Sequence, residues 1–109
     1  MSTSDDQQAV IIYLRLSDDQ FGAEGESFAL YDVEEALGEA VKRAGELDGH
    51  EIGGGFFTVY VYGSNADAML QTIARVLARH TPKPGSYVLL RRGPPGSSSQ
   101  RFELPLTLH

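Results

Sequence analysis

The chain has 109 residues, no cysteine and a formal net charge of -6 at pH 7. This length is typical of one domain with one hydrophobic core, so we predict a single domain over residues 1–109. The lack of cysteine excludes disulfides, thiol chemistry and cysteine-ligated zinc. No apolar run approaches the ~20 residues that span a bilayer, and the N-terminus has no signal-peptide pattern. We therefore expect a cytoplasmic protein with no membrane partner.

The charge is distributed unevenly along the chain. Residues 1–51 carry thirteen carboxylates against three basic side chains, a net of -10, whereas residues 52–109 carry two carboxylates against six basic side chains, a net of +4. Two solvated faces of opposite sign would produce this pattern without any partner. The alternative is an acidic surface that binds a basic protein, and its candidate residues are Asp18, Asp19, Glu34 and Glu35.

The first half of the chain predicts a strand and a helix. Residues 1–8 are polar and expected to be disordered, which leaves an ordered core of about residues 9–105. Residues 9–16 alternate as a strand does, and residues 17–26 form an acidic, glycine-containing loop without the ligand spacing of an EF-hand. Residues 28–44 have apolar side chains at helical spacing, and Gly45 is expected to end this helix with a positive φ.

The second half predicts a hairpin, a second helix and two further strands. A short strand over residues 48–52 and a glycine turn at residues 53–55 lead into a strongly β-prone strand over residues 56–62. Ser64 and Asp67 are spaced as in a capping box at the start of the second helix. Two prolines stop that helix, and strands are predicted over residues 86–92 and 101–105, the last at a sheet edge because it contains Pro105.

This order of elements predicts an α+β protein with a ferredoxin-like β-α-β-β-α-β topology and a short fifth strand at the C-terminus. An antiparallel sheet would carry both helices on one face. The side chains expected beneath the helices are Val10, Ile12, Leu14, Phe57, Val59 and Val61. The opposite face would carry Tyr13, Arg15, Thr58, Tyr60, Tyr62 and either Arg91 or Arg92. We predict that this second face is the binding surface.

The sequence offers no set of residues for catalysis or for metal binding. His50, His80 and His109 lie in separate elements and lack metal-ligand spacing. Strand alternation places Asp48 and His50 on one face and Glu51 on the other, so these three do not form an acid–base set. We therefore predict no catalytic residue, no metal and no cofactor.

Aromatic side chains on the first and third strands are also where the RNA-recognition motif stacks bases. The stretch from Gly55 to Tyr62 lacks the basic residue that opens the third-strand signature of that motif, and Thr58 and Val59 fit it poorly. A domain with a pI of about 4.9 also lacks the basic surface that nucleic-acid binding requires. We predict no nucleic-acid partner.

Three stretches resemble a family of small, functionally uncharacterised bacterial proteins. They are Leu47-Asp-Gly-His-Glu-Ile-Gly-Gly-Gly55, Tyr60-Val-Tyr-Gly63 before Ala66-Asp-Ala68, and Gly85-Ser-Tyr-Val88 before Arg92-Gly-Pro-Pro95. The resemblance implies a bacterial source and a single α+β domain. It implies no activity, substrate or catalytic residue.

Two classes of function follow from these observations. The first is a non-enzymatic interaction module that forms a homodimer through its aromatic sheet face. In a more specific version, the protein is an immunity-type inhibitor whose acidic half covers a basic partner protein. The alternative is a dimeric α+β-barrel-like protein that binds a small ligand, or a cofactor-independent enzyme, with a cavity over the same sheet face. The polar groups available there are those of Arg15 and Thr58.

Overall fold

A computed structural model describes residues 7–17, 26–80, 82–94 and 96–104 of the chain. In chain order, its elements are β1 (Gln8–Arg15), α1 (Glu26–Val41), β2 (Gly45–Gly53), β3 (Phe56–Gly63), α2 (Ala66–His80), β4 (Tyr87–Arg91) and β5 (Ser99–Glu103). The predicted acidic loop and Pro105 lie largely or wholly outside the described residues. Neither α1 nor α2 is long and apolar enough to cross a membrane.

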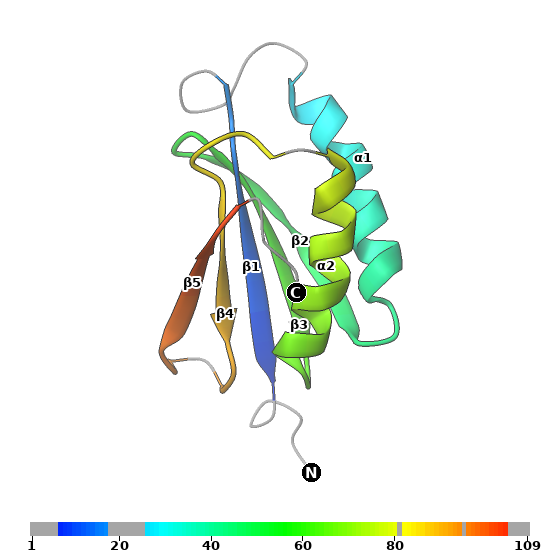
Figure 1. Ribbon diagram of the computed structural model, residues 1–109, viewed down its shortest axis with the longest axis vertical. Helices are drawn as coiled ribbons and strands as arrows, with labels where there is room; N and C mark the ends of the chain where they lie inside the picture. The colour runs from blue at the N-terminus through cyan, green and yellow to red at the C-terminus, as the bar shows by residue number, and fades with distance from the viewer. Residues whose placement is uncertain (1–6, 18–25, 81, 95, 105–109) are drawn as a thin grey trace.

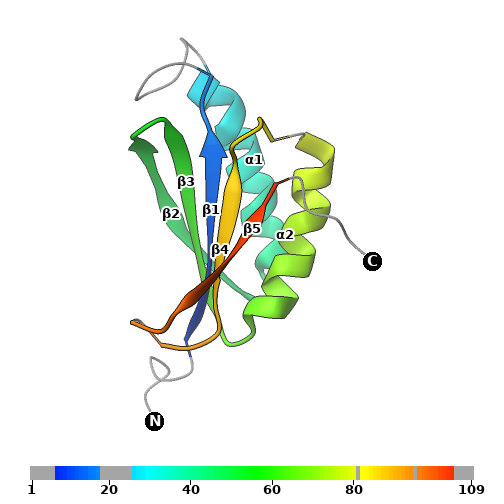
Figure 2. The same ribbon diagram turned by 60° about the vertical axis from the view of Figure 1, so that its left-hand side comes forward.

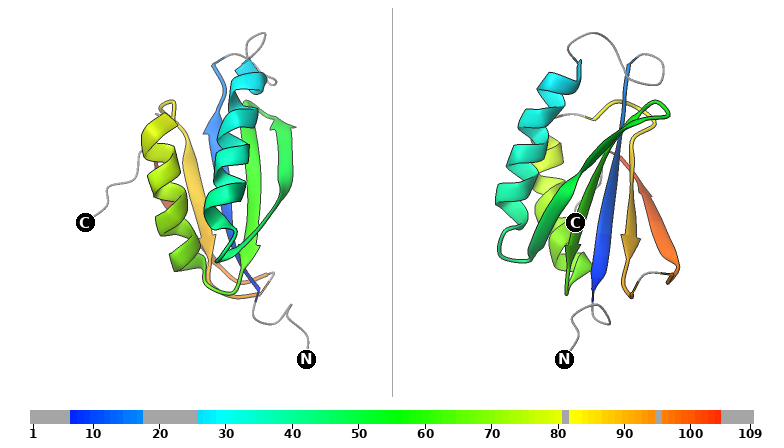
Figure 3. Two further views of the ribbon diagram at one scale, coloured as in Figure 1. Left: turned by 90° about the vertical axis from the view of Figure 1, so that its right-hand side faces the viewer. Right: turned by 180° about the vertical axis from the view of Figure 1, so that it is seen from behind.

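The strands form one antiparallel sheet in the order β2-β3-β1-β4-β5. Both helices pack on the same face of this sheet, and the other face has no described element over it (Figures 1 and 2). The α+β class and the antiparallel sheet are confirmed. The order also places β1 in the middle of the sheet and β5 beside β4 at one edge (Figure 3).

The core lies between the sheet and the two helices. The β1 and β3 side chains predicted to lie beneath the helices are all buried, with at most 4% of any of them exposed. Helix α1 contributes Val33, Leu37 and Val41 to the same cluster, and α2 contributes apolar side chains that recur at helical spacing: Met69, Ile73, Val76 and Leu77. The prediction of which β1 and β3 side chains lie beneath the helices is confirmed. It could be made from the sequence because strand alternation decides which side chains of these two strands face inward.

Gly45 has a different role from the one that the sequence predicts. It opens β2 instead of ending α1 with a positive φ, and α1 ends at Val41 in a turn where the Ala44 N–H donates to the Val41 carbonyl. A Cβ atom on Gly45 would lie 2.3 Å from the Tyr62 carbonyl oxygen and 2.5 Å from the Met69 sulfur. Glycine is required here because β2, β3 and α2 approach too closely for any side chain.

The ends of the other elements are set by hydrogen bonds and turn geometry. Gly54 and Gly55 have φ values of 60° and 86°, so the predicted glycine turn does join β2 to β3. Asn65 caps α2, since its Oδ1 accepts a hydrogen bond of 3.0 Å from the Ala68 N–H; the predicted Ser64 capping box is wrong by one residue. A second hydrogen bond at the start of α2, of 2.8 Å, runs from the Ala66 N–H to the Gln8 side chain. Residue 8 is therefore part of β1, although the sequence placed it in the disordered N-terminal segment.

We predict that Gly45→Ala destabilises the protein by about 1 to 3 kcal/mol, because the added methyl group overlaps a backbone oxygen that cannot move without disturbing the sheet. Gly53→Ala is the matched control in the same strand: its Cβ would meet no atom within 4 Å, and its φ is not positive. The control should change stability by less than ~1 kcal/mol. Urea unfolding of both variants measures the difference, and equal midpoints would contradict the prediction.

Candidate interaction face

The candidate site is the open face, which we define as the side of the sheet that points away from α1 and α2. The strand register shows which side chains meet there. Ile11 in β1 lies opposite Tyr60 of β3 and Leu89 of β4, and Tyr13 lies opposite Thr58 and Tyr87. The next row toward the other end of β1 pairs Ala9 with Tyr62 and Arg91. The centre of the open face is therefore apolar and rich in tyrosine.

Three aromatic rings form a cluster on this face. The Tyr13 and Tyr87 rings are stacked, with centroids 4.5 Å apart, and the Phe56 ring meets them edge-on at 5.9 Å and 5.6 Å. Offset-stacked and edge-to-face pairs at such distances are the favourable arrangements for aromatic side chains. The cluster joins three strands, because Tyr13 comes from β1, Phe56 from β3 and Tyr87 from β4.

Two arginines lie over these rings. The Arg101 guanidinium carbon is 3.7 Å from the centroid of Tyr87, and that of Arg15 is 5.2 Å from the centroid of Phe56. A guanidinium over an aromatic face is attracted by the negative charge density of the ring. Arg101 also donates to the Glu103 carboxylate, which keeps it over β4. The cluster is thus flanked by the Arg15 guanidinium of β1 and by the Arg101–Glu103 ion pair of β5.

Tyr60 carries a strong hydrogen bond on the same face. Its hydroxyl donates to the Glu51 carboxylate of β2, and this bond is the main reason why the pKa of Tyr60 rises to about 12. Partial burial and the negative charge of Glu51 add to the effect. Burial also raises the pKa of Tyr13, with smaller contributions from Tyr87 and Glu51. Both phenols therefore stay neutral donors across the physiological pH range.

The residues predicted for the binding surface differ in how accessible they are. Tyr13, Tyr60 and Tyr62 are partly buried by their neighbours and Arg15 is exposed. Thr58 is only 7% exposed, so its hydroxyl is covered and unsuited to contact a ligand. Among the described residues, Tyr31 is the one large hydrophobic residue that is more than about a third exposed, at 39%, and it lies on α1 and not on the open face. The aromatic rings of the open face are partly buried by contact with one another, and no described element lies over them.

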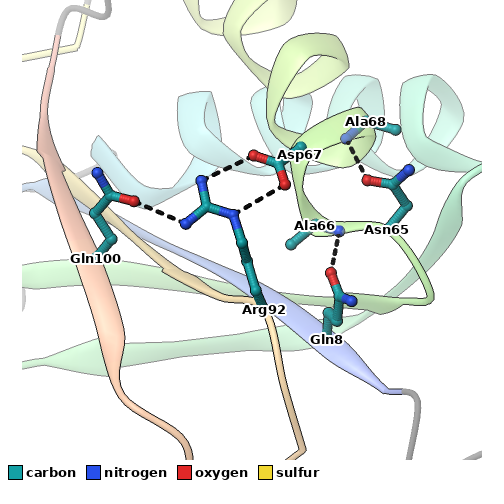
Figure 4. Close-up of polar contacts among 7 residues, drawn as sticks. All are labelled: Gln8, Asn65, Ala66, Asp67, Ala68, Arg92 and Gln100. Atoms are coloured by element: carbon teal, nitrogen blue, oxygen red, sulfur yellow. Dashed lines mark hydrogen bonds and ion pairs between the residues drawn. The ribbon is translucent and has the colours of Figure 1, made fainter.

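The pair Arg91 and Arg92 divides between the two sides of the sheet. Arg91 lies on the open face, opposite Ala9 and Ser99. Arg92 turns to the helix side, where its Nε and Nη2 donate to the two Asp67 carboxylate oxygens, both at 2.9 Å, and its Nη1 donates to Gln100 at 2.8 Å (Figure 4). This paired contact lowers the pKa of Asp67 and ties the start of α2 to β5.

The four predicted acidic residues are not shown to share a surface. Asp18 and Asp19 lie outside the described residues. Glu35 is exposed on α1, but the Glu34 side chain is only 17% exposed, and its Oε2 lies 2.8 Å from His50 Nδ1. His50 faces α1 and stacks on the Phe57 ring at 4.6 Å. The Glu34–His50 contact could not be predicted from the sequence. Glu34 lies on α1 and His50 on β2, and the spacing of residues along the chain does not show how these two elements pack.

The structure locates no metal centre in the part of the chain that it describes. No group of three or more histidine, aspartate or glutamate side chains is positioned there to hold a metal ion. A pocket of about 150 Å³ lies on the helix side at the end of β1, and its lining combines apolar residues with three basic ones: Leu14, Arg15, Ala29, Leu30, Val33, Leu77, His80, Pro82 and Lys83. Residue 81, between two of these residues, lies outside the described part of the chain, and we assign the pocket no ligand.

Comparison with protein-family models, with curated proteins and with solved structures found no match. The resemblance to a bacterial family therefore stays a prediction, and the function must be argued from the geometry of the open face.

The hydrogen bond between Tyr60 and Glu51 leads to a prediction about how the stability of the fold depends on pH. In Glu51→Gln the pKa of Tyr60 should fall from about 12 toward its ordinary value of 10, because the charged acceptor is lost. Because the pKa of Tyr60 is higher in the folded protein than in the unfolded chain, it adds to the stability of the fold below pH ~10. This contribution is lost as the pH rises from ~10 toward the pKa of Tyr60 in the folded protein. The variant should therefore lose less stability than wild type between pH 10 and 12.

Spectrophotometric titration of tyrosinate measures this pKa. The chain has five tyrosines, so Tyr60→Phe serves as the control that assigns the signal by difference. If Glu51→Gln left the Tyr60 titration unchanged, the hydrogen bond would not be the cause of the raised pKa.

Proposed function

We propose that the protein is a non-enzymatic interaction module that forms a homodimer through its open face. One observation carries this proposal: both helices lie on one side of the sheet, and the other side carries half-buried aromatic and aliphatic side chains with no described element over them. Ile11 and Leu89 lie at the centre of that surface, with tyrosines on both sides of them. An antiparallel sheet whose second face meets only water normally carries polar side chains there. This composition indicates a partner.

The arrangement of the elements supports a ferredoxin-like fold as the basis of the module. Strands β1 and β2 are separated by β3, and α1 connects them; β3 and β4 are likewise separated by β1 and connected by α2. This order corresponds to the split β-α-β arrangement, with β5 added beside β4. Such an arrangement leaves one sheet face for a partner.

A second copy of the chain is the simplest partner for the open face. Closed two-fold dimers are the commonest oligomers, and a two-fold interface places the same patch on both sides. Tyrosine suits such an interface because its ring is apolar while its hydroxyl can reach water or a polar group at the rim. The arginines over Phe56 and Tyr87 provide the polar rim.

We predict that wild type has the mass of two chains at micromolar concentration, measured by light scattering during size-exclusion chromatography. Ile11→Glu should give a folded monomer, because it places a charge at the centre of the open face and leaves the helix-packed core intact. Tyr60→Glu tests the same surface at a second position. Gln71→Glu, at an exposed position on α2, is the matched control and should stay dimeric.

A monomeric wild type would contradict the homodimer. Dimers of unchanged affinity in both open-face variants would place the interface elsewhere on the molecule. Circular dichroism of each variant verifies that the fold is retained.

A second candidate function is the binding of a basic partner protein by the acidic side of the molecule, as in an immunity-type inhibitor. Exposed carboxylates line α1, and a further one follows at the bulge of the adjacent strand β2: Asp32, Glu35 and Glu39, with Asp48. This surface is distinct from the aromatic cluster, so the two interactions could occur together. Its position on α1 and β2 agrees with the net charge of -10 in residues 1–51.

Neutralising Asp32, Glu35 and Glu39 to their amides tests this candidate. The substitutions spare Glu34, whose bond to His50 holds α1 against β2. Association with a basic partner should slow more than dissociation speeds up, because exposed charges act mainly on the encounter. The immobilised wild type and variant are compared for what they capture from lysate at low salt and release at high salt. An unchanged capture profile would contradict a role for this surface.

The alternative of a small-ligand-binding protein or a cofactor-independent enzyme would need a cavity between two open faces. Arg15 and Thr58 were the two polar residues expected to face such a cavity, and of these only Arg15 is exposed, because Thr58 is buried. The described pocket lies on the helix side of the sheet. The open face therefore supports binding of another protein surface better than it supports chemistry.

A further inference from the structure

The two edge strands of the sheet differ in regularity and in charge. Along β2 the register shifts between Leu47 and Gly49, and its open-face carboxylates, Glu46 and Glu51, are both negative. A second β2 placed against this edge would meet an irregular backbone and charges of its own sign. β5 pairs with β4 without a register shift and carries both signs of charge. No described element lies beyond β5 (Figures 1 and 3), so a further strand can pair with this edge.

The backbone polar groups of β5 alternate between its two sides. The Leu104 N–H donates to the Ser86 carbonyl, just before β4, so residue 104 turns its backbone groups toward that strand. In an antiparallel ladder, the N–H and carbonyl of successive residues point to alternate sides of the strand. Phe102 therefore bonds to β4, whereas Arg101 and Glu103 direct their N–H and carbonyl groups away from the sheet. A further strand would find its hydrogen-bonding groups at these two residues.

The side chains of β5 suit a second copy of β5. Arg101 and Glu103 lie on the open face, because they pair with Leu89 and Tyr87 of β4. Arg101 donates to Glu103 within the chain, and the two side chains are 53% and 64% exposed. In an antiparallel pair of β5 strands centred on Phe102, Arg101 of each copy lies directly opposite Glu103 of the other. The same two residues then supply the outward backbone groups and a pair of opposite charges.

The charges favour this register over its neighbours. A pair centred on Arg101 or on Glu103 would place two like charges directly opposite each other, which destabilises a sheet. A pair centred on Gln100 would place Arg101 opposite Ser99 and form no ion pair. In the pair centred on Phe102, Arg101 can keep its bond within the chain and add one across the strands, because a guanidinium has five N–H donors. The two Phe102 rings, partly buried at the edge of the core, would lie beside each other on the helix side.

This contact is small and keeps both open faces on one side. Antiparallel strands in one sheet are related by a two-fold axis perpendicular to the sheet, so the two copies present the same face in the same direction. Residues 100–104 of each chain take part, a length of about 16 Å at ~3.3 Å per residue. One short strand buries much less than the ~800 Å² per partner of a standard interface, so the contact is weak and fills only at high protein concentration.

We infer that β5 is a second self-association surface, at which two copies pair antiparallel about Phe102 through Arg101 and Glu103. The inference does not depend on the open-face homodimer, because it uses a different part of the molecule. The contact leaves the open face uncovered. It can therefore join open-face dimers into larger assemblies where the local concentration of the protein is high.

The Ile11→Glu chain tests the β5 contact in the absence of the open-face contact. Its mass is measured by sedimentation from about 20 μM to about 1 mM, a range that brackets weak association. We expect monomers at the low end and pairs at the high end. Amide hydrogen exchange of the same samples, followed by NMR, reports the register. Exchange of the Arg101 and Glu103 N–H groups should slow in the pair, while that of Phe102, which already bonds to β4, should stay the same.

Reversal of charge tests the role of the ion pairs. Arg101→Glu places carboxylates opposite each other and should weaken association about tenfold. The double exchange of Arg101→Glu with Glu103→Arg restores opposite charges across the strands and should return the affinity to within about threefold of the parent. Arg75→Glu, at an exposed position on α2, is the matched control for net charge and should leave association unchanged.

The inference is overturned if the Ile11→Glu chain stays monomeric at ~1 mM, a concentration at which weak contacts fill. It is also overturned if pairs form without slower exchange at Arg101 and Glu103, or if the double exchange fails to restore association. A monomeric wild type at micromolar concentration would contradict the open-face homodimer and leave the β5 contact standing. Circular dichroism verifies that each variant is folded, and Tyr60→Glu replaces Ile11→Glu if that chain does not fold.

Discussion

The register between β1 and β3 is the constraint on which the rest of the structure depends. It places Val10 against Val61 and Ile12 against Val59 on the helix side, where all four are fully buried. The same register places tyrosines of β3 beside Ile11 and Ala9 on the open face. A slip of one residue would exchange the two faces of either strand. The core and the candidate site are therefore two consequences of one pairing, and neither can be altered without the other.

Elements whose position depends on their own residues could be predicted from the sequence. The alternation in β1 and β3, the helical stripe of α2 and the glycine turn all follow from local periodicity or from positive φ. Gly45 and the start of β2 could not be predicted in this way. Gly45 is required by contacts with Tyr62 and Met69, which are distant in sequence and become neighbours only when α2 packs on the sheet. Local pattern predicts the elements, and tertiary packing decides where they end.

The same division applies to the open face. Tyr13, Tyr60 and Tyr62 could be identified because β1 and β3 alternate clearly. Tyr87 of the aromatic cluster and Arg101 over its ring were missed because their place depends on how β4 pairs with β1 and how β5 pairs with β4. The assignment of Arg91 and not Arg92 to this face depends on where β4 ends, and the contact of Arg92 with Asp67 and Gln100 decides it.

Strand β2 shows how a local irregularity changes what a face can do. The register shifts between Leu47 and Gly49, so Asp48 has no partner in β3. Without this bulge, simple alternation from Leu47 would turn His50 to the open face and Glu51 toward the helices. With it, His50 lies opposite Val59 and reaches Glu34 of α1, while Glu51 reaches Tyr60 on the open face.

The bulge therefore contributes to both sides of the sheet at once. On the helix side it supplies the imidazole that stacks on Phe57 and fixes α1 against the edge strand. On the open face it keeps Glu51 on the same side as Glu46, although residues an odd number of positions apart point to opposite faces of a regular strand. Two carboxylates thus share the open face at the β2 edge because β2 contains one extra residue. A straight strand of the same composition would leave a histidine beside the tyrosines and bury a carboxylate against the core.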